Sequence, residues 1–415
     1  MTEGWMTFPI KDLVEPIETS DPGKELGSIF TYIDVSSVSR ETLAVTKPTR
    51  VLGSKAPSRA RRVVRAGDVI FATIRPTLSR VAQIPPELDG SICSTGFFVL
   101  RPKNIVLGRF LYYWLLGETF AKAMETLQRG ASYPAVSDSD VKNQIAILPP
   151  LPEQKHIVAI LDEAFAGIDR AIANTEKNLA NARELFESYL NYLLSRQLGT
   201  QDSESLFELC ASKPITYGVI KLGRDMEDGV PCLRTSNVRK LSIDTKGIKR
   251  IAPDLSQQYG RTVLQGGEVL VNVRGTLGGV AVATQAMSGW NVSREVAVVP
   301  VDQRKVLPAF AAYSIAKRES QDWLTGVQKG VAYTGINLTD LRQLRINLPS
   351  LDHQMYLVSQ LDEMAANCDA IGQLYQQTIS ALAELKKSLL QKAFSGELTA
   401  DKAVSNPSFK GEEIA

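Results

Sequence analysis

Apolar or small residues recur three and four positions apart through residues 151–198, with polar side chains between them. This spacing predicts one long amphipathic helix. Pro152 suits its first turn, and Gly199 follows it as a stop. At 1.5 Å per residue its ~46 residues span roughly 70 Å, so the helix needs an equally long partner. The seam consists of Ile157, Leu161, Ala164, Ile168, Ile172, Thr175, Leu179, Ala182, Phe186, Leu190 and Leu193.

The partner is predicted in the same chain, because residues 351–394 carry the same spacing. Leu161-Asp162-Glu163 recurs as Leu361-Asp362-Glu363, 200 positions later. Heptads sustained over this length are typical of a coiled-coil seam rather than of two unrelated surface helices. The second seam consists of Leu357, Leu361, Met364, Cys368, Ile371, Tyr375, Thr378, Leu382, Leu385 and Leu389.

The segment before the first helix alternates short apolar runs with glycine and proline, which predicts short strands, turns and one or two helices. The aromatic run 110–116 is expected to pack in a core, although a ring there could also touch an unstacked base. Residues 128–133 predict an exposed glycine loop. Strands are expected within 67–75, 94–102 and 141–148.

The segment before the second helix repeats this plan. Residues 267–274, 295–300 and 328–333 correspond to the first strand, second strand and glycine loop. Gly275–Gly279 lies between two strand-like runs, so it predicts a hairpin turn rather than a phosphate-binding loop. The chain therefore divides into two similar globular segments, 1–150 and 200–350, two long helices, 151–199 and 351–397, and a flexible tail, 398–415.

Length and composition agree with this division. A chain of 415 residues is too long for one core, and 44% apolar with 22% charged residues is ordinary for a globular protein. The four cysteines, in no CxxC pair, indicate neither a zinc site nor a disulfide framework and suggest a cytoplasmic location. No run approaches the ~18 apolar residues of a membrane span, so no membrane association is expected.

Net charge is only +2, but the basic residues are clustered. Between Ser36 and Arg65 eight lysines and arginines face a single acid, Glu41. A second, mostly basic stretch covers residues 234–261. Such runs are candidate phosphate-contacting surfaces, and the alternative for each is a solvated basic loop.

Residues typical of catalysis are scarce. The two histidines, His156 and His353, lie near the predicted helix starts, where a structural role is favoured. There is no GxxxxGK[ST] stretch for a nucleotide and no HExxH for zinc, so no metal site is expected. Asn406-Pro407-Ser408-Phe409 only partly matches the Asn-Pro-Pro-aromatic stretch of adenine methyltransferases, and no cofactor-binding glycine motif precedes it.

The order of these parts resembles the specificity subunit of type I restriction-modification systems. The resemblance covers nearly the whole chain and is carried by Leu148–Gln154, which enters the first helix, and by Gln391–Leu398, which closes the second. Asp352-His353 replaces the Pro152-Glu153 of the first copy, and Asp352 is expected to cap the helix.

The resemblance implies an α+β protein: two similar α/β target recognition domains, separated by two long antiparallel coiled-coil helices, in an internal pseudo-twofold repeat. Each domain would read half of an asymmetric bipartite sequence in double-stranded DNA. Two modification subunits would dock on the helices and methylate adenine, and two restriction subunits could join them. This chain would hold no cofactor, and S-adenosylmethionine would be bound by the modification subunits.

On this interpretation the DNA contacts come from basic residues, most of them to phosphate and a few to bases. The tyrosines of the two glycine loops could approach DNA or could pack within their own loops. The candidates are Arg50, Lys55, Arg59, Arg61, Arg62, Arg75 and Tyr133 in the first domain, and Arg234, Arg239, Lys246, Lys249, Arg250, Arg274 and Tyr333 in the second.

Other functions are compatible with the same sequence. A stand-alone bipartite DNA-binding protein would have polar outer helix faces, whereas a docked partner predicts exposed apolar side chains there. A coiled-coil scaffold whose globular ends bind protein would lack basic surfaces on both domains. A catalytic function would require Asn406 to lie beside a cofactor pocket.

Overall fold

The computed structural model describes residues 4–195, 203–211, 213–329 and 335–400. Its contacts divide the chain into two compact units. Unit 1 contains the chain up to Glu176 and from Gln377 onward, and unit 2 runs from Lys177 to Gln376. The two predicted long helices are confirmed as α5, Leu151–Ser195, and α10, Leu351–Ser395, and each contributes one part to each unit.

Unit 1 has a mixed α and β composition, as the sequence predicts. Its two larger sheets have the strand orders β2-β9-β6-β7 and β4-β3-β8-β5, and β1 pairs with β10. The strands are β1 Met6–Pro9, β2 Val14–Glu15, β3 Ile29–Ile33, β4 Thr49–Leu52, β5 Ala60–Val63, β6 Val69–Ala72, β7 Val81–Gln83, β8 Ile92–Ser94, β9 Phe97–Pro102 and β10 Ile145–Leu148. The α-helices besides α5 and α10 are α1 Ile10–Leu13, α2 Gly108–Leu115, α3 Glu118–Leu127, α4 Asp138–Lys142 and α11 Glu397–Ala400, and the 3₁₀ turns are η1 Pro22–Lys24, η2 Val35–Ser37, η3 Gly53–Lys55, η4 Pro76–Leu78 and η5 Pro86–Leu88.

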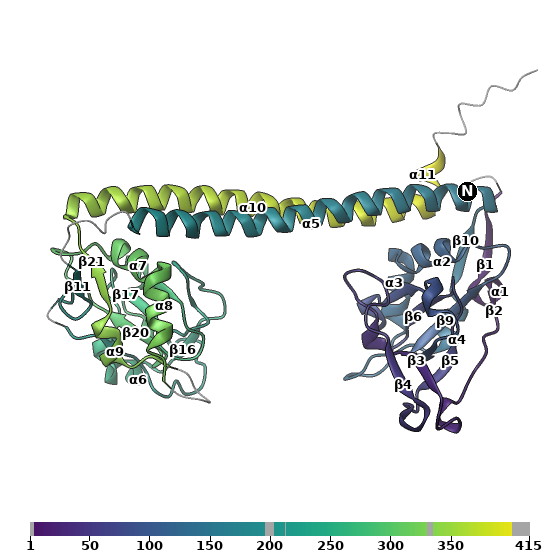
Figure 1. Ribbon diagram of the computed structural model, residues 1–415, viewed down its shortest axis with the longest axis horizontal. Helices are drawn as coiled ribbons and strands as arrows, with labels where there is room; N and C mark the ends of the chain where they lie inside the picture. Colours follow the sequence, from purple (N-terminus) through teal and green to yellow (C-terminus); the bar gives the residue numbers. More distant parts are fainter. Residues whose placement is uncertain (1–3, 196–202, 212, 330–334, 401–415) are drawn as a thin grey trace, which may run out of the picture. The chain divides into compact units, whose positions relative to one another are not determined.

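Helix α2 joins the sheet of unit 1 to the long helices. It lies between β6 and the long helices in Figure 1, and its apolar side chains enter one core with Ile157 and Leu161 of α5 and Leu390 of α10. The aromatic run therefore packs in the core, as predicted: Phe110 and Tyr113 are almost fully buried. Burial of such large rings stabilises this junction.

Unit 2 repeats the arrangement. A four-stranded sheet has the order β12-β20-β17-β18, a three-stranded sheet has the order β16-β13-β19, and β14-β15 and β11-β21 are pairs. The strands are β11 Ser203–Ser205, β12 Thr216–Tyr217, β13 Val230–Leu233, β14 Val238–Arg239, β15 Ser242–Ile243, β16 Lys249–Ile251, β17 Val269–Asn272, β18 Val280–Val282, β19 Asn291–Val292, β20 Val296–Val299 and β21 Arg345–Asn347. The helices besides α5 and α10 are α6 Pro253–Gln258, α7 Pro308–Ala316, α8 Arg318–Gly326 and α9 Leu338–Gln343, with the 3₁₀ turns η6 Gly260–Thr262 and η7 Gln285–Met287.

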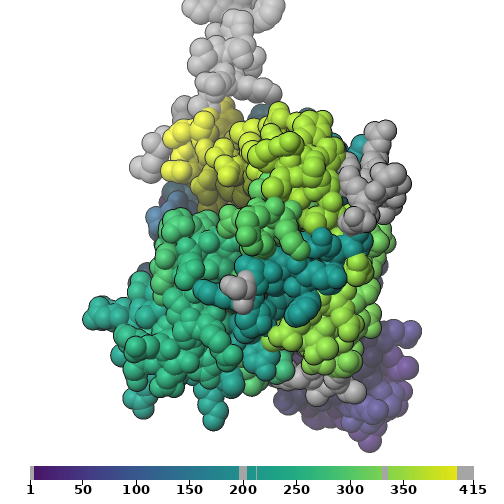
Figure 2. Space-filling model, turned by 90° about the vertical axis from the view of Figure 1, so that its left-hand side faces the viewer, coloured from purple at the N-terminus to yellow at the C-terminus, as the bar shows by residue number. Residues whose placement is uncertain are grey.

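In unit 2, α7 takes the place of α2. Its residues share a core with Leu190 of α5 and with Leu357 and Leu361 of α10. Figure 2 shows the start of α10, in yellow-green, against the green globular residues of this unit. The hairpin predicted around residues 275–279 is confirmed, because β17 and β18 pair antiparallel on either side of it.

The long helices pack antiparallel within each unit. In unit 1, Asp169 of α5 pairs with Lys386 of α10, whereas Glu153, earlier on α5, accepts a hydrogen bond from Thr399, which follows α10. In unit 2, Leu179 contacts α10 at Gly372, and Leu190, later on α5, packs near Leu361. The seam positions are buried mainly where a globular domain covers the helices, as at Leu161 and Leu361.

Two sequence expectations are wrong. Val141 does not begin the last strand: Ser137 and Asp140 form a capping box that starts α4, and the strand begins at Ile145. Asp352 does not cap α10, because that helix already begins at Leu351; instead the Ser350 hydroxyl accepts a hydrogen bond from the His353 amide, 3.4 Å away. Residues 397–400 form α11, and the rest of the predicted tail, with Asn406, lies outside the described residues.

Candidate nucleic-acid interface

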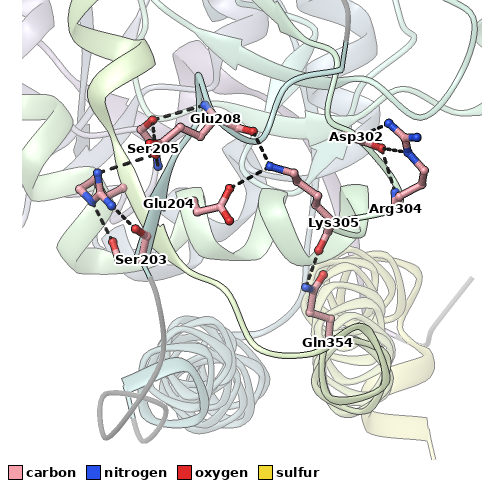
Figure 3. Close-up of polar contacts among 9 residues, drawn as sticks. Ser203, Glu204, Ser205, Glu208, Asp302, Arg304, Lys305 and Gln354 are labelled. Carbon is pink, nitrogen blue, oxygen red and sulfur yellow. Dashed lines mark hydrogen bonds and ion pairs between the residues drawn. The ribbon is translucent and has the colours of Figure 1, made fainter.

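A buried glutamine fixes each long helix to its globular domain. In unit 1 the Gln154 amide donates to the carbonyls of Ile105 and Pro149, 3.0 and 2.9 Å away, and accepts from the Leu107 amide. In unit 2 Gln354 makes the same three bonds, to the Lys305 and Pro349 carbonyls and from the Leu307 amide, at 2.8–3.0 Å. Figure 3 shows the contact of Gln354 with Lys305, whose ammonium group contacts Glu204.

A tyrosine and an aspartate make a second repeated contact. The hydroxyl of Tyr113 in α2 donates to Asp162 of α5, and that of Tyr313 in α7 donates to Asp362 of α10, both over 2.6 Å. Burial, followed by the hydrogen bond to the carboxylate, raises the pKa of both tyrosine hydroxyls. These contacts hold the sheet, and the loops at its end, against the helices.

In unit 1 those loops bring Arg75 and Tyr133 together. Arg75 follows β6 in a left-handed conformation, φ 50°, and its amide donates to the Pro134 carbonyl, 2.7 Å away. Its guanidinium lies 5.5 Å from the centre of the Tyr133 ring, and that side chain is 73% exposed. The bridge between Arg129 and Ala135 closes the predicted exposed loop. A cation stacked on an exposed ring can contact phosphate or an unstacked base.

The other unit 1 candidates divide into two groups. Arg50, Lys55 and Arg59 are exposed in β4, in η3 and in the turn before β5, and they have no ion-pair partner among the described residues. Arg61 pairs with Asp21 over 3.0 Å, and the half-buried Arg62 pairs with Asp138 over 2.7 Å. Arg62 also donates to the Phe97 carbonyl. The basic stretch therefore offers exposed cations at one end and structural ion pairs at the other.

Unit 2 has a corresponding pair, the half-buried Arg274 and the exposed Tyr217. The Arg274 guanidinium lies 5.9 Å from the centre of the Tyr217 ring, and its backbone bridges to Gly335 as that of Ile74 does to Ala135. Tyr333, the predicted counterpart of Tyr133, lies outside the described residues.

The remaining unit 2 candidates differ in exposure. Arg239 and Lys246 are exposed, and Lys249 is half-buried in β16. Arg234 donates to the Gly247 carbonyl over 3.1 Å, and Arg250 to the Gly229 carbonyl over 3.0 Å. These two arginines thus support loops of their own domain.

Sequence reasoning missed Tyr217. It lies beside Arg274 because β12 pairs with β20. Glu295, just before β20, accepts hydrogen bonds from the backbone amides of Val273 and Arg274. The one local signal is the glycine that follows it: a side chain at Gly218 would clash with the Val292 carbonyl, 1.8 Å from an added Cβ, so this segment needs glycine.

Chemistry beyond binding is not apparent in the part of the chain that is described. No cluster of three or more histidine, cysteine or carboxylate side chains is arranged to hold a metal ion there. His156 and His353 lie in the first turns of α5 and α10. No helix among the same residues combines the length and apolar character needed to cross a membrane.

Comparison with known proteins places this fold in a family. Residues 2–180 and 209–379 match the family model described as "Type I restriction modification DNA specificity domain". The EcoBI specificity subunit of Escherichia coli is 25% identical over 74% of this chain and 69% of its own length, and the EcoKI subunit of strain K12 is 24% identical over 84% and 78%.

Solved structures agree with these matches. A chain from a study of assembly and conformational transition of the type I R-M system is 28% identical, with a TM-score of 0.79 over 95% of this chain and 98% of that one. The HsdS subunit from Thermoanaerobacter tengcongensis is also 28% identical, with a TM-score of 0.58 over 96% and 98%. The likeness therefore covers both globular segments and both long helices.

Proposed function

We propose that this chain, which belongs to the type I restriction-modification DNA specificity family, recognises an asymmetric DNA sequence in two separate parts, one part by each unit. The observation that carries the proposal is the repetition of one scaffold with different exposed loops. Gln154 and Gln354 make identical contacts, whereas the stacked pairs, Arg75 with Tyr133 and Arg274 with Tyr217, come from different positions. Different contact surfaces read different bases, so the two half-sites differ.

The long helices are the proposed docking surface for two modification subunits. They carry exposed apolar side chains, which a partner would cover and which a stand-alone DNA-binding protein would not need. These include Leu185 on α5 and Met355, Tyr356, Ile371 and Leu385 on α10. Restriction subunits would join this assembly.

In this proposal the chain supplies specificity and the modification subunits supply the chemistry. S-adenosylmethionine would bind to those subunits, and one adenine in each half-site would be flipped out of the duplex to be methylated. The residues of this chain would contact phosphates and base edges around the flipped adenine.

Methylome sequencing tests the proposal. A host that expresses the chain with its genomically adjacent methyltransferase is compared with the same host lacking the chain. The expected result is N6-methyladenine at one split, asymmetric motif that disappears when the chain is removed. An unchanged methylome, in a host where the methyltransferase is shown to be active, would overturn the proposal.

A further inference from the structure

The strongest difference between the two units lies where α2 or α7 meets the long helices. In unit 1 Arg109 of α2 lines this place and pairs with Asp162 of α5. Its Nε donates to Asp162 Oδ1 over 2.7 Å, and its guanidinium lies 4.4 and 4.8 Å from the ring centres of Tyr112 and Tyr113. The arginine is thus held by a carboxylate and two aromatic faces at once.

A second cation completes the arrangement in unit 1. Lys386 of α10 pairs with Asp169 and lies 4.8 Å from the centre of the Phe165 ring. Both carboxylates that α5 turns toward this place, Asp162 and Asp169, therefore have a basic partner within the unit.

Unit 2 has aspartates at the positions of Asp162 and Asp169 but no basic residues at those of Arg109 and Lys386. Asp362 and Asp369 occupy the positions of Asp162 and Asp169, 200 residues later, and neither has an ion-pair partner among the described residues. Tyr313 still donates to Asp362 Oδ1. In unit 1 the corresponding atom, Asp162 Oδ1, also accepts a hydrogen bond from Arg109. Three large side chains that line this place in unit 1 correspond to alanines in unit 2: Ala309, Ala312 and Ala365 stand in place of Arg109, Tyr112 and Phe165.

A cavity of about 300 Å³ lies at this place in unit 2 and is here named the Asp362 pocket. The corresponding cavity in unit 1, about 290 Å³, is lined by Arg109, Tyr112 and Asp162. Ala309, Ala312 and Tyr313 line the Asp362 pocket, together with Leu241 and Met287, and among the described residues Asp362 is its only charged lining residue. A larger cavity, about 690 Å³, shares Tyr313 and Leu241 with it. That cavity is lined by Arg183, Glu187, Lys240 and Asp369, and Lys240 pairs with Glu187 over 2.8 Å.

We propose that the Asp362 pocket binds a guanidinium group on a short alkyl chain, supplied from outside the unit, in the position that Arg109 fills in unit 1. Asp362 is the charge partner, and its carboxylate is already oriented by Tyr313. The apolar walls accommodate the alkyl chain. A guanidinium suits this site better than an ammonium ion, because its planar face can lie on the Tyr313 ring while its edge bonds to the carboxylate.

The test is saturation-transfer NMR of N-ethylguanidinium with the full chain. The probe is expected to receive saturation from the wild-type chain, whereas N-ethylurea, a neutral molecule of the same shape, receives much less. Asp362→Asn is expected to weaken binding about tenfold or more, the loss of one charge-assisted hydrogen bond. Ala309→Arg should abolish binding, because the introduced guanidinium then bonds to Asp362 as Arg109 bonds to Asp162. Asp352→Asn, an exposed aspartate at the start of the same helix, is the control that should bind normally.

Unit 1 offers the converse test. Arg109→Ala removes the guanidinium that pairs with Asp162, so N-ethylguanidinium should bind that variant at a second site and raise its unfolding temperature more than that of the wild type. Equal saturation of wild type and Asp362→Asn would overturn the proposal, as would equal saturation by the guanidinium and the urea. That comparison does not depend on Arg109→Ala folding well.

A further arm identifies the source of the guanidinium. If the free chain binds the probe and its complex with the modification subunit does not, an arginine of that subunit occupies the pocket. If both bind it, the natural ligand is a free guanidine. Binding of the probe to the free chain does not depend on DNA recognition. The guanidinium proposal therefore stands if the proposed function is wrong, and the proposed function stands if the probe does not bind.

Discussion

At the scale of single residues, Gln354 is a buried amide with partners on both its nitrogen and its oxygen. Gln354→Ala would leave the Leu307 amide and the Lys305 and Pro349 carbonyls without partners in a dry environment. We expect a loss of about 2–4 kcal/mol in the free energy of unfolding, measured by urea titration. Gln373→Ala, at an exposed position of the same helix, is the control and should change the midpoint little. Equal effects of the two variants would show that the repeated amide contact is not stabilising.

The four thiols should differ in reactivity, because they differ in burial. Burial raises the pKa of Cys93 and of Cys232 to about 12 and that of Cys210 to about 11. At pH 8 these three thiols stay protonated, and only the thiolate reacts. The pKa of Cys368 is also raised by burial, and like Cys210 this residue is partly exposed; it lies on α10 beside the larger cavity. We expect one fast-reacting thiol per native chain with Ellman's reagent at pH 8, and none in Cys368→Ser.

At the scale of elements, α10 is held to unit 2 by a few fully buried seam residues. Leu361 is 0% exposed in the core that contains α7, whereas Leu385 of the same helix is 46% exposed. Leu361→Ala should cost about 2–5 kcal/mol of unfolding free energy, through lost burial and the cavity left behind. Leu385→Ala should cost much less. Circular dichroism during urea unfolding measures both, and a similar cost for the two would mean that the seam, rather than the globular domain, holds the helix.

The elements also show what the sequence could and could not predict. The long helices and their repeat can be predicted from local periodicity, in which Leu161 and Leu361 are matching apolar positions. Contacts between distant segments leave no such pattern. The bond from Gln154 to Ile105 joins residues 49 apart, and the pairing of Arg62 with Asp138 joins residues 76 apart. Sequence reasoning therefore placed Arg62 among the DNA contacts without its internal partner, and overlooked the glutamines that attach the helices.

At the scale of the whole molecule, the repeat separates positions that hold the scaffold from positions that vary. Gln154, Tyr113 and Asp162 have identical counterparts 200 residues later and make the same bonds there. Arg109 does not, because its counterpart is Ala309. An aligned sequence reveals this difference, but only the structure shows that Arg109 pairs with Asp162 and that Asp362 has no such partner among the described residues. Asymmetry within a repeated scaffold is what a protein needs to bind two different half-sites with one fold.

The last prediction concerns DNA binding by the assembled complex. Arg75 and Arg274 each present a guanidinium beside an exposed tyrosine, one in each unit, so each should neutralise a phosphate or read a base. A lost phosphate contact lowers the slope of log affinity against log salt by about 1, and a lost base contact weakens specific binding by about 1–3 kcal/mol.

Fluorescence anisotropy of labelled duplexes at several salt concentrations separates these effects. Arg75→Ala should relax discrimination in one half-site and Arg274→Ala in the other. Arg304→Ala is the control, because Arg304 is exposed and, in the part of the chain that the structure describes, pairs only with its neighbour Asp302. If both variants bind every duplex with the affinity and salt slope of the control, these loops do not contact DNA. The next positions to replace are then the exposed residues Arg50, Lys55 and Arg59 in unit 1 and Arg239 and Lys246 in unit 2.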